Sequence, residues 1–262
     1  MVSERTTDMY FDSHAHLNDP KFAEDLPQVL EKIRAAQVTK ILNIGCCWDS
    51  SQDCVTLANT YDFIWCAVGT HPDIAEEADE ALMERYRQLI LSQPRVKAIG
   101  EIGLDYFYET PPRDVQKRAF RLQMELAQQL EMPVVVHERQ AHGDGMAIID
   151  EFPKVKGVFH CYSGSPEMAK ELIKRGWYVG FTGVLTFKNA RKALEAAAAV
   201  PLERILIETD CPFMAPEPFR GTRNDPSLVP YMAKKLAEVR GISVEEAARA
   251  TMENACRLFR ID

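Results

Sequence analysis

The chain alternates between two hydrophobic patterns. Short, continuous apolar runs rich in β-branched residues predict eight strands, at residues 9–12, 40–44, 63–68, 96–100, 133–136, 157–159, 177–181 and 204–207. Between these runs, apolar positions recur at helical spacing and predict helices at residues 25–36, 51–61, 79–92, 113–130, 143–150, 166–175 and 189–200. Two further helices, at residues 227–240 and 243–259, follow the eighth strand. A strand followed by a helix is therefore the repeating unit of the chain.

This repeating unit predicts the fold class. Strands that are apolar along their whole length are buried on both faces, as in a parallel sheet covered by helices. Eight such units within 262 residues are what a closed (β/α)8 TIM barrel of the α/β class needs. An open doubly wound sheet usually needs fewer units, and no GxGxxG motif follows the first strand. We predict a single barrel domain at residues 9–262, preceded by a flexible tail at residues 1–8.

Composition narrows the class of protein. With 46% hydrophobic and 27% charged residues the chain is typical of globular proteins, and no segment approaches the roughly 20 apolar residues that span a bilayer. The polar start does not resemble an export signal. The seven cysteines are scattered without a CxxC motif, which predicts packed thiols in a reducing compartment. We expect a cytoplasmic, monomeric protein without membrane contact. The net charge of -8 argues against a broad basic surface that tracks nucleic-acid phosphates.

Five of the six histidines lie near the ends of predicted strands. His14 and His16 follow the first strand, and their spacing of two places both imidazoles on one face of an extended chain. The ends of strands three, four, five, six and eight carry, in order, His71, Glu101, His137, His160 and Asp210. One histidine at a strand end is most often a hydrogen-bonded rim residue, but this joint occurrence at the catalytic rim of a barrel predicts a metal site. His142 is expected on a surface loop.

The number of donors indicates two metal ions. Four imidazoles and two carboxylates exceed the four ligands of one tetrahedral ion, so we expect two divalent cations that share a bridging carboxylate. Nitrogen-rich ligation favours zinc, manganese, iron or cobalt over magnesium, and the sequence does not distinguish Zn, Mn, Mg, Co, Fe and Ni. Cysteine and serine nucleophiles find less support. Cys161 and Cys211 would face away from their neighbours His160 and Asp210 if the strands continued, so we expect both to be packed thiols.

Several motifs along the chain carry a family resemblance. They read GTHP at 69–72, GEIGLD at 100–105, PVVVH at 133–137, HCYSG at 160–164, ETDCP at 208–212 and RGTRNDP at 220–226. Together with the HxH pair at the start and NACRLF at 254–259, they resemble the successive signature blocks of the TatD family of metal-dependent deoxyribonucleases. The resemblance covers essentially the whole chain.

The resemblance implies roles for individual residues. It implies that one metal is held by His14, His16, Glu101 and Asp210, and that Glu101 bridges to a second metal held by His137 and His160. It implies that His71 approaches the substrate and that the protein hydrolyses DNA phosphodiesters, often as a 3′ to 5′ exonuclease on single strands. Gln140 and Thr222 stand where the family often has a carboxylate and a lysine, and these departures concern substrate preference more than metal binding.

The expected chemistry is metal-assisted hydrolysis. Two cations acidify a bridging water to hydroxide and hold a phosphoryl oxygen, while Asp210 orients the hydroxide and accepts its proton. Candidate phosphate contacts, each more often a solvated cation when taken alone, are Arg139, Lys188, Arg220 and Arg223.

Two alternative functions stay open. One is a deacylase or amidase, including removal of a D-amino acid from tRNA; Glu101 argues against it, since barrel amidohydrolases commonly bridge their metals with a modified lysine. The other is a catalytically silent metal-binding or interaction protein. If two divalent ions lie at the rim, the charge of -8 predicts a local, metal-anchored grip on a few nucleotides at the end of a DNA strand.

Overall fold

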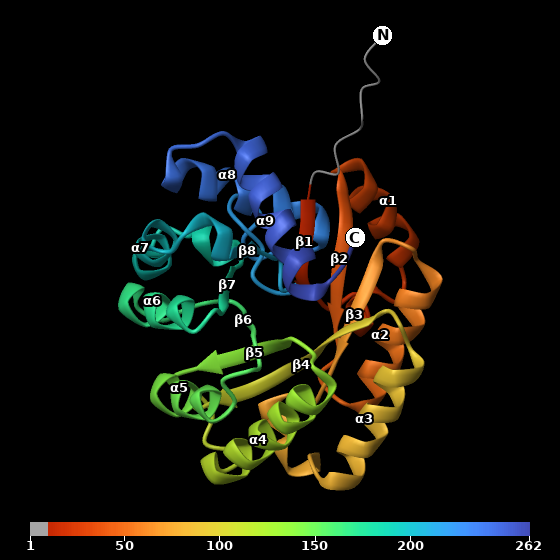
Figure 1. The fold of residues 1–262 in the computed structure, drawn as a ribbon. Coiled ribbons are helices and arrows are strands. Elements are labelled where there is room, and N and C mark those ends of the chain that lie inside the picture. The colour runs from red at the N-terminus through yellow and green to blue at the C-terminus, as the bar shows by residue number, and fades with distance from the viewer. Residues whose placement is uncertain (1–9) are drawn as a thin grey trace.

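The computed structural model describes residues 10–262 (Figure 1). Its strands are β1 (Tyr10–Ala15), β2 (Val38–Ile44), β3 (Ile64–Val68), β4 (Val96–Asp105), β5 (Val134–Arg139), β6 (Gly157–Phe159), β7 (Tyr178–Phe181) and β8 (Ile205–Ile207). All eight predicted strands are present, and β1, β4 and β5 extend past their expected ends. The predicted tail at residues 1–8, and residue 9 of the first predicted strand, lie outside the described residues.

The strands form one parallel sheet in the order β1 to β8. Its two edges meet through backbone hydrogen bonds. Asp210 N donates to His14 O at 2.9 Å, and His16 N donates to Cys211 O at 3.0 Å. The sheet therefore closes almost completely into a barrel, which confirms the predicted single-domain (β/α)8 architecture.

Helices cover the outside of the barrel (Figure 1). They are α1 (Leu26–Ala35), α2 (Trp48–Thr60), α3 (Glu80–Ser92), α4 (Arg113–Leu130), α5 (His142–Glu151), α6 (Pro166–Lys174), α7 (Arg191–Ala199), α8 (Val229–Arg240) and α9 (Val244–Phe259). Each corresponds to a predicted helix. The start of α2 is earlier than predicted because Cys47 and Ser50 cap each other's backbone N–H groups. Among residues 10–262, none of the helices has the length and apolar character of a membrane span.

The barrel interior is filled by side chains and closed at one end by α9. The interior layer comprises Phe11, Leu42, Ile44, Ala67, Ala98, Val135, Val158, Tyr178 and Leu206, and α9 adds Met252, Ala255, Leu258 and Phe259. Asn254 of α9 donates to the backbone oxygens of Leu202 and Ile205 at the start of β8. The helix therefore closes the end where the strands begin, and we call this packed layer the barrel floor.

Candidate metal centre and substrate cavity

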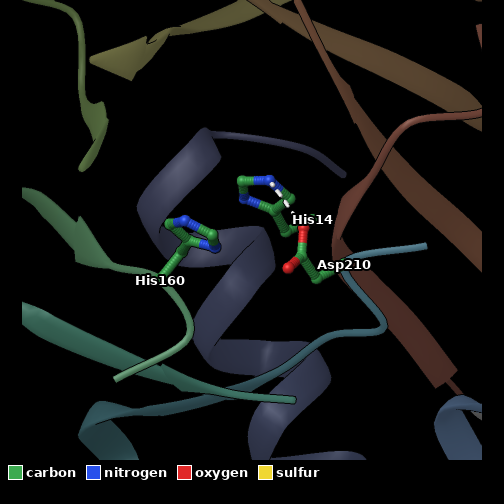
Figure 2. Close-up of side chains that lie close together, drawn as sticks. All are labelled: His14, His160 and Asp210. Carbon is green, nitrogen blue, oxygen red and sulfur yellow. Dashed lines mark ion pairs between the residues drawn. The ribbon is translucent and has the colours of Figure 1, made fainter. Parts of the chain in front are cut away.

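The opposite end of the barrel gathers the predicted metal ligands. His14 lies in β1 and His16 directly after it. Glu101 lies in β4 and His137 in β5, while His160 follows β6 and Asp210 follows β8. Figure 2 shows His14, His160 and Asp210 side by side, although they come from segments far apart in the sequence. The imidazoles of His14 and His160 are stacked, with ring centroids 3.9 Å apart.

Four donor atoms surround one point of this site. The Nε2 atoms of His14 and His16 lie 3.0 Å apart, as expected from their spacing in the sequence. Glu101 Oε2 lies 3.4 Å from His14 Nε2 and 3.7 Å from His16 Nε2. Asp210 Oδ1 lies 3.7 Å and 3.5 Å from the same two nitrogens. Tetrahedral ligands at 2.0–2.1 Å from zinc are about 3.4 Å from one another, so this donor set fits a divalent cation.

A second donor group uses the other oxygen of Glu101. Its Oε1 lies 2.7 Å from His160 Nε2 and 3.0 Å from His137 Nδ1. The two imidazole nitrogens lie 3.4 Å apart. His71 Nε2 is on the same side, 3.7 Å from Glu101 Oε1. One carboxylate therefore presents one oxygen to each of two groups of imidazoles, which is the geometry that a bridging ligand requires.

Two irregularities in the sheet help aim these ligands. The register between β4 and β5 shifts between Ile99 and Ile102, on either side of Glu101. The register between β1 and β2 shifts between Asp12 and Ala15, on either side of His14. Ala98 packs in the barrel interior, so strict alternation along β4 would turn Glu101 away from it. Such shifts re-aim side chains in many sheets.

The charges of the site are complementary. Burial raises the pKa of the Glu101 carboxyl, but the imidazoles of His160 and His14 lower it by more, and the net pKa lies well below its usual range. Burial lowers the pKa of His137, while hydrogen bonds to Asp105 and Glu101 raise it to a net value of about 9. Imidazoles bind metals in their neutral form, so metal binding at neutral pH requires His137 to release a proton.

Outer oxygens lie behind three imidazoles, two of them at hydrogen-bond distance and the third at ion-pair distance. Asp105 Oδ2 lies 3.0 Å from His137 Nε2. Ile44 O lies 3.0 Å from His16 Nδ1. Glu208 Oε1 lies 3.6 Å from His160 Nδ1. Carboxylates behind metal-binding histidines usually fix the ring orientation and raise ligand basicity. Sequence reasoning placed Asp105 and Glu208 at strand ends but gave them no role.

The site opens into a cavity of about 880 Å³. The predicted residues His16, His71, Glu101, His137, Arg139, His160 and Asp210 contribute to its wall. The remaining lining residues are Cys46, Asp73, Glu138, Cys161, Tyr162, Ser163, Val184, Asn189, Ala190, Arg191, Lys192, Ala193, Phe213 and Met214. This volume is typical of small-molecule and substrate sites. A buried donor set at the base of an open cavity is an arrangement suited to hydrolysis.

Comparison with protein families identifies the chain. The family model described as TatD related DNase matches residues 11–260. The chain belongs to the TatD family. It is accordingly a metal-dependent hydrolase, and the predicted family resemblance is confirmed.

Relatives agree with this assignment along the whole length. The uncharacterized metal-dependent hydrolase YabD of Bacillus subtilis is 42% identical and matches 97% of this chain and 100% of its own. A protein of Pantoea vagans named 3′-5′ ssDNA/RNA exonuclease TatD is 34% identical, over 96% of this chain and 99% of its own. The crystal structure of YJJV, a TatD homolog from Escherichia coli, superimposes with a TM-score of 0.91 at 30% identity, over 97% of this chain and 98% of that one.

In this TatD-family chain, the four predicted phosphate contacts lie in different surroundings. Arg139 lines the cavity, whereas Lys188 and Arg220 are exposed and lie outside its wall. The guanidinium of Arg220 lies 4.3 Å from the centre of the Phe187 ring. Arg223 donates two hydrogen bonds to the Asp25 carboxylate, at 2.9 Å and 2.6 Å. Arg191 and Lys192, which sequence reasoning missed, lie in the cavity wall at the start of α7.

The expectation that all seven cysteines are buried thiols is wrong for four of them, since Cys46, Cys47, Cys161 and Cys256 are only partly buried. Cys46 and Cys161 line the cavity, and Cys46 Sγ lies 3.8 Å from His16 Nδ1. The strand assumed to continue past His160 ends at Phe159, and Cys161 adopts a left-handed conformation with φ of 43°. The alternation of faces therefore does not extend to Cys161. Cys211, in contrast, is buried as expected.

His142 is also placed differently from the prediction. It begins α5 instead of lying on a loop, and its Nδ1 pairs with the Glu138 carboxylate one turn earlier. Its side chain is 44% exposed, so the expected surface position holds. The residue belongs to neither donor group.

Proposed function

We propose that the protein is a phosphodiesterase that removes nucleotides from single-stranded DNA ends in the 3′ to 5′ direction with two divalent cations. The observation that carries the proposal is the position of Glu101, whose two carboxylate oxygens face separate groups of imidazoles. The exonuclease name of the Pantoea vagans relative supports the substrate class. The cavity volume of about 880 Å³ is large enough to hold a nucleotide.

The donor set assigns residues to each cation. His14, His16, Glu101 and Asp210 would hold one, and Glu101, His137 and His160 the other. When bound, two cations supply Lewis acidity and lower the pKa of water to near neutrality. The nitrogen-rich donors favour zinc, manganese, iron or cobalt.

Asp210 is the proposed proton acceptor. Burial raises its pKa, but the hydrogen bond to His16 and the charges of His14 and His160 lower it by more. The carboxylate is therefore ionised at neutral pH and able to orient a water molecule and take its proton. His71 lies at the open side of the second group, where it can contact a phosphoryl oxygen.

Basic side chains in the cavity wall would bind the substrate phosphates, without a broad basic surface. Arg139 lies in the cavity wall beside the second donor group, and its NH1 atom is 3.8 Å from Asp105 Oδ2. Lys192 lies in the same wall. Guanidinium groups bind phosphate in a bidentate manner, whereas an ammonium group acts as a point charge. Six cysteines, namely Cys46, Cys47, Cys54, Cys66, Cys161 and Cys211, form no disulfide bond, which supports the proposal that the protein works in the reducing cytoplasm.

A substrate panel tests the proposal. The metal-loaded protein is given 5′-labelled single-stranded DNA, the matching duplex and D-aminoacyl-tRNA, each with manganese or zinc. We expect stepwise release of nucleotides from single-stranded DNA and none of the amino acid from tRNA. Preferential deacylation of the tRNA would overturn the proposal.

A variant pair tests the bridging role of Glu101. In Glu101→Gln, kcat/KM for single-stranded DNA should fall by more than about a hundredfold, because the neutral amide is a poor bridge between two cations. Bound metal should fall below two equivalents. The matched control is Glu238→Gln, on the outer helix α8, which should behave like the parent protein. Unchanged hydrolysis by Glu101→Gln would contradict the shared-metal mechanism.

A further inference from the structure

Large hydrophobic side chains are exposed at few positions, and most of these follow two strands, β4 and β8, whose ends carry donor residues. Within residues 10–262 they are Leu91 (71% exposed), Phe107 (49%), Tyr108 (54%), Phe213 (49%) and Met214 (41%). Phe107 and Tyr108 follow β4, and Phe213 and Met214 follow β8. Leu91 alone of this set is remote, on the outer helix α3. Exposed apolar groups that gather at one place usually mark a binding surface.

The aromatic pair after β4 is tied to the second donor group. The carboxylate of Asp105 accepts a hydrogen bond from Phe107 N at 2.9 Å and contacts His137 Nε2 at 3.0 Å. The rings of Phe107 and Tyr108 meet edge to face, with centroids 4.9 Å apart. The guanidinium of Arg139 lies 3.6 Å from the centre of the Phe107 ring. One carboxylate thus positions both an imidazole of the site and the start of this exposed pair.

The aromatic residue after β8 is tied to the first donor group. Phe213 N donates to Asp210 O at 2.9 Å. The buried side chain of Asn224 donates to Phe213 O at 2.6 Å and to Thr209 O at 2.9 Å. Lys21 Nζ lies 4.5 Å from the centre of the Phe213 ring, which itself lines the cavity. A buried amide therefore holds this exposed ring beside the ligand Asp210.

The two aromatic groups follow strands on opposite sides of the barrel, and each reaches the cavity wall, one through Arg139 and the other through Phe213 itself. In a ring of eight strands, β4 and β8 are four positions apart. Each group combines an exposed ring with a cation, Phe107 with Arg139 and Phe213 with Lys21. The two donor groups lie between them.

Rings paired with cations match the chemistry of unpaired nucleotides. A base stacks on an aromatic face whatever its identity, while the adjoining phosphate meets the cation. Neighbouring base pairs cover both faces of a base inside a duplex, so no face is left for a protein ring to stack on. Rings of this kind would therefore select single strands over duplexes without selecting a base sequence.

Building on the proposed phosphodiesterase function, we propose that Phe107 and Phe213 are specificity-determining residues that stack unpaired bases on either side of the phosphodiester bond to be cleaved. Tyr108 supports Phe107 through its edge contact. Arg139 and Lys21 would take the phosphates adjoining the stacked bases. The rings would hold the strand across the mouth so that its phosphate faces Glu101 and Asp210.

A double-mutant cycle, in which one change is made in the protein and the other in the substrate, tests the stacking. Phe107→Ala and Phe213→Ala are assayed on oligo-dT and on an oligonucleotide of equal length that has abasic residues near its 3′ end. For oligo-dT we expect KM to rise about tenfold in each variant, with kcat changed much less. On the abasic oligonucleotide each variant should match the parent protein, because no base is left to stack. Leu91→Ala, another exposed hydrophobic residue, is the control and should match the parent on both.

Two further variants separate stacking from simple apolar contact. Phe213→Trp should preserve the KM for oligo-dT, whereas Phe213→Leu should raise it as Phe213→Ala does. The proposal is overturned if Phe107→Ala and Phe213→Ala weaken activity equally on the two oligonucleotides, or if Phe213→Leu matches the parent protein.

Binding is measured separately so that a failure of the proposed nuclease function can be recognised. Oligo-dT that carries 2-aminopurine near its 3′ end and phosphorothioate linkages that resist hydrolysis is titrated with the metal-loaded parent protein, and stacking should quench its fluorescence. The same protein carrying Phe213→Ala should quench it less. If the parent protein cleaves no oligonucleotide but quenching depends on Phe213, the proposed function fails and the stacking surface stands. Quenching that is independent of both rings would reject the stacking surface.

Discussion

At the scale of single residues, the carboxylate behind His160 offers a sharp test of how the donor groups are held. Glu208 is fully buried and accepts hydrogen bonds from Ser13 Oγ at 3.0 Å and from Cys161 N at 2.6 Å. Its Oε1 lies 3.6 Å from His160 Nδ1. Glu208→Gln keeps the size but removes the charge. We expect metal affinity to fall about 10- to 100-fold, measured by competition with a chromophoric chelator.

The control for this variant is Asp79→Asn, which alters the N-cap of the outer helix α3. It should lower thermal stability slightly and leave metal affinity unchanged. If Glu208→Gln bound metal as tightly as the parent protein, Glu208 would only fill space behind the ring.

A second residue-scale prediction concerns pH. The hydrogen bond with Glu138 raises the pKa of His142 above 6.5, against a smaller lowering by burial. The folded protein therefore holds this proton more tightly than the unfolded chain. The pair stabilises the fold fully below pH 6.5, and its contribution disappears as the pH rises through the raised pKa.

The measurement compares the Tm of the parent protein and His142→Gln at about pH 5.5 and about pH 9. We expect the variant to be the less stable of the two at the lower pH, with a difference that shrinks at the higher pH. An equal difference at both values would mean that the charge of His142 is not what matters.

At the scale of elements, α9 is the helix on which the barrel floor depends. Phe259 is 1% exposed, and its ring centroid lies 6.3 Å from that of Phe11 in β1. Phe259→Ala should lower the free energy of unfolding by about 3–5 kcal/mol, measured by urea titration, because it opens a cavity between helix and barrel. Leu91→Ala should change it by less than about 0.5 kcal/mol. A small effect of Phe259→Ala would mean that α9 contributes little to closing the barrel.

Secondary structure and strand-end residues could be predicted from the sequence, whereas contacts between distant segments could not. The strands and helices follow from hydrophobic period, and the donor residues from their position at strand ends, because all eight ends of a parallel barrel share one rim. The ion-pair partner of Arg223 cannot be predicted in this way. Asp25 lies 198 residues earlier in the chain, and only the closed barrel brings them together. Phe107 and Phe213 were not predicted as site residues either. Both lie in loops, and the hydrophobic periodicity of a sequence predicts helices and strands but not the conformation of a loop.

At the scale of the whole molecule, the charge of -8 predicts how activity responds to salt. A protein that contacts only a few phosphates at the end of a DNA strand releases few counterions. The logarithm of kcat/KM for oligo-dT should fall with the logarithm of salt concentration at a slope equivalent to about two or three phosphates. A steep slope, equivalent to many phosphates, would indicate an extended binding track that the charge distribution does not suggest. Removing the metal with a chelator should abolish binding at all salt concentrations.

The barrel floor has a consequence for how the protein is made. The interior layer draws on all eight strands, yet α9, which seals it, follows all of them in the chain. The edge of β1, synthesised early, must also wait for Asp210 and Cys211 before its backbone groups near His14 and His16 are paired. During translation the incomplete barrel therefore exposes apolar surface until α9 has been made and has packed against it. Asp210 also comes late in the chain, after β8, so the nascent chain completes its donor set when, of the α-helices, only α8 and α9 remain to be made.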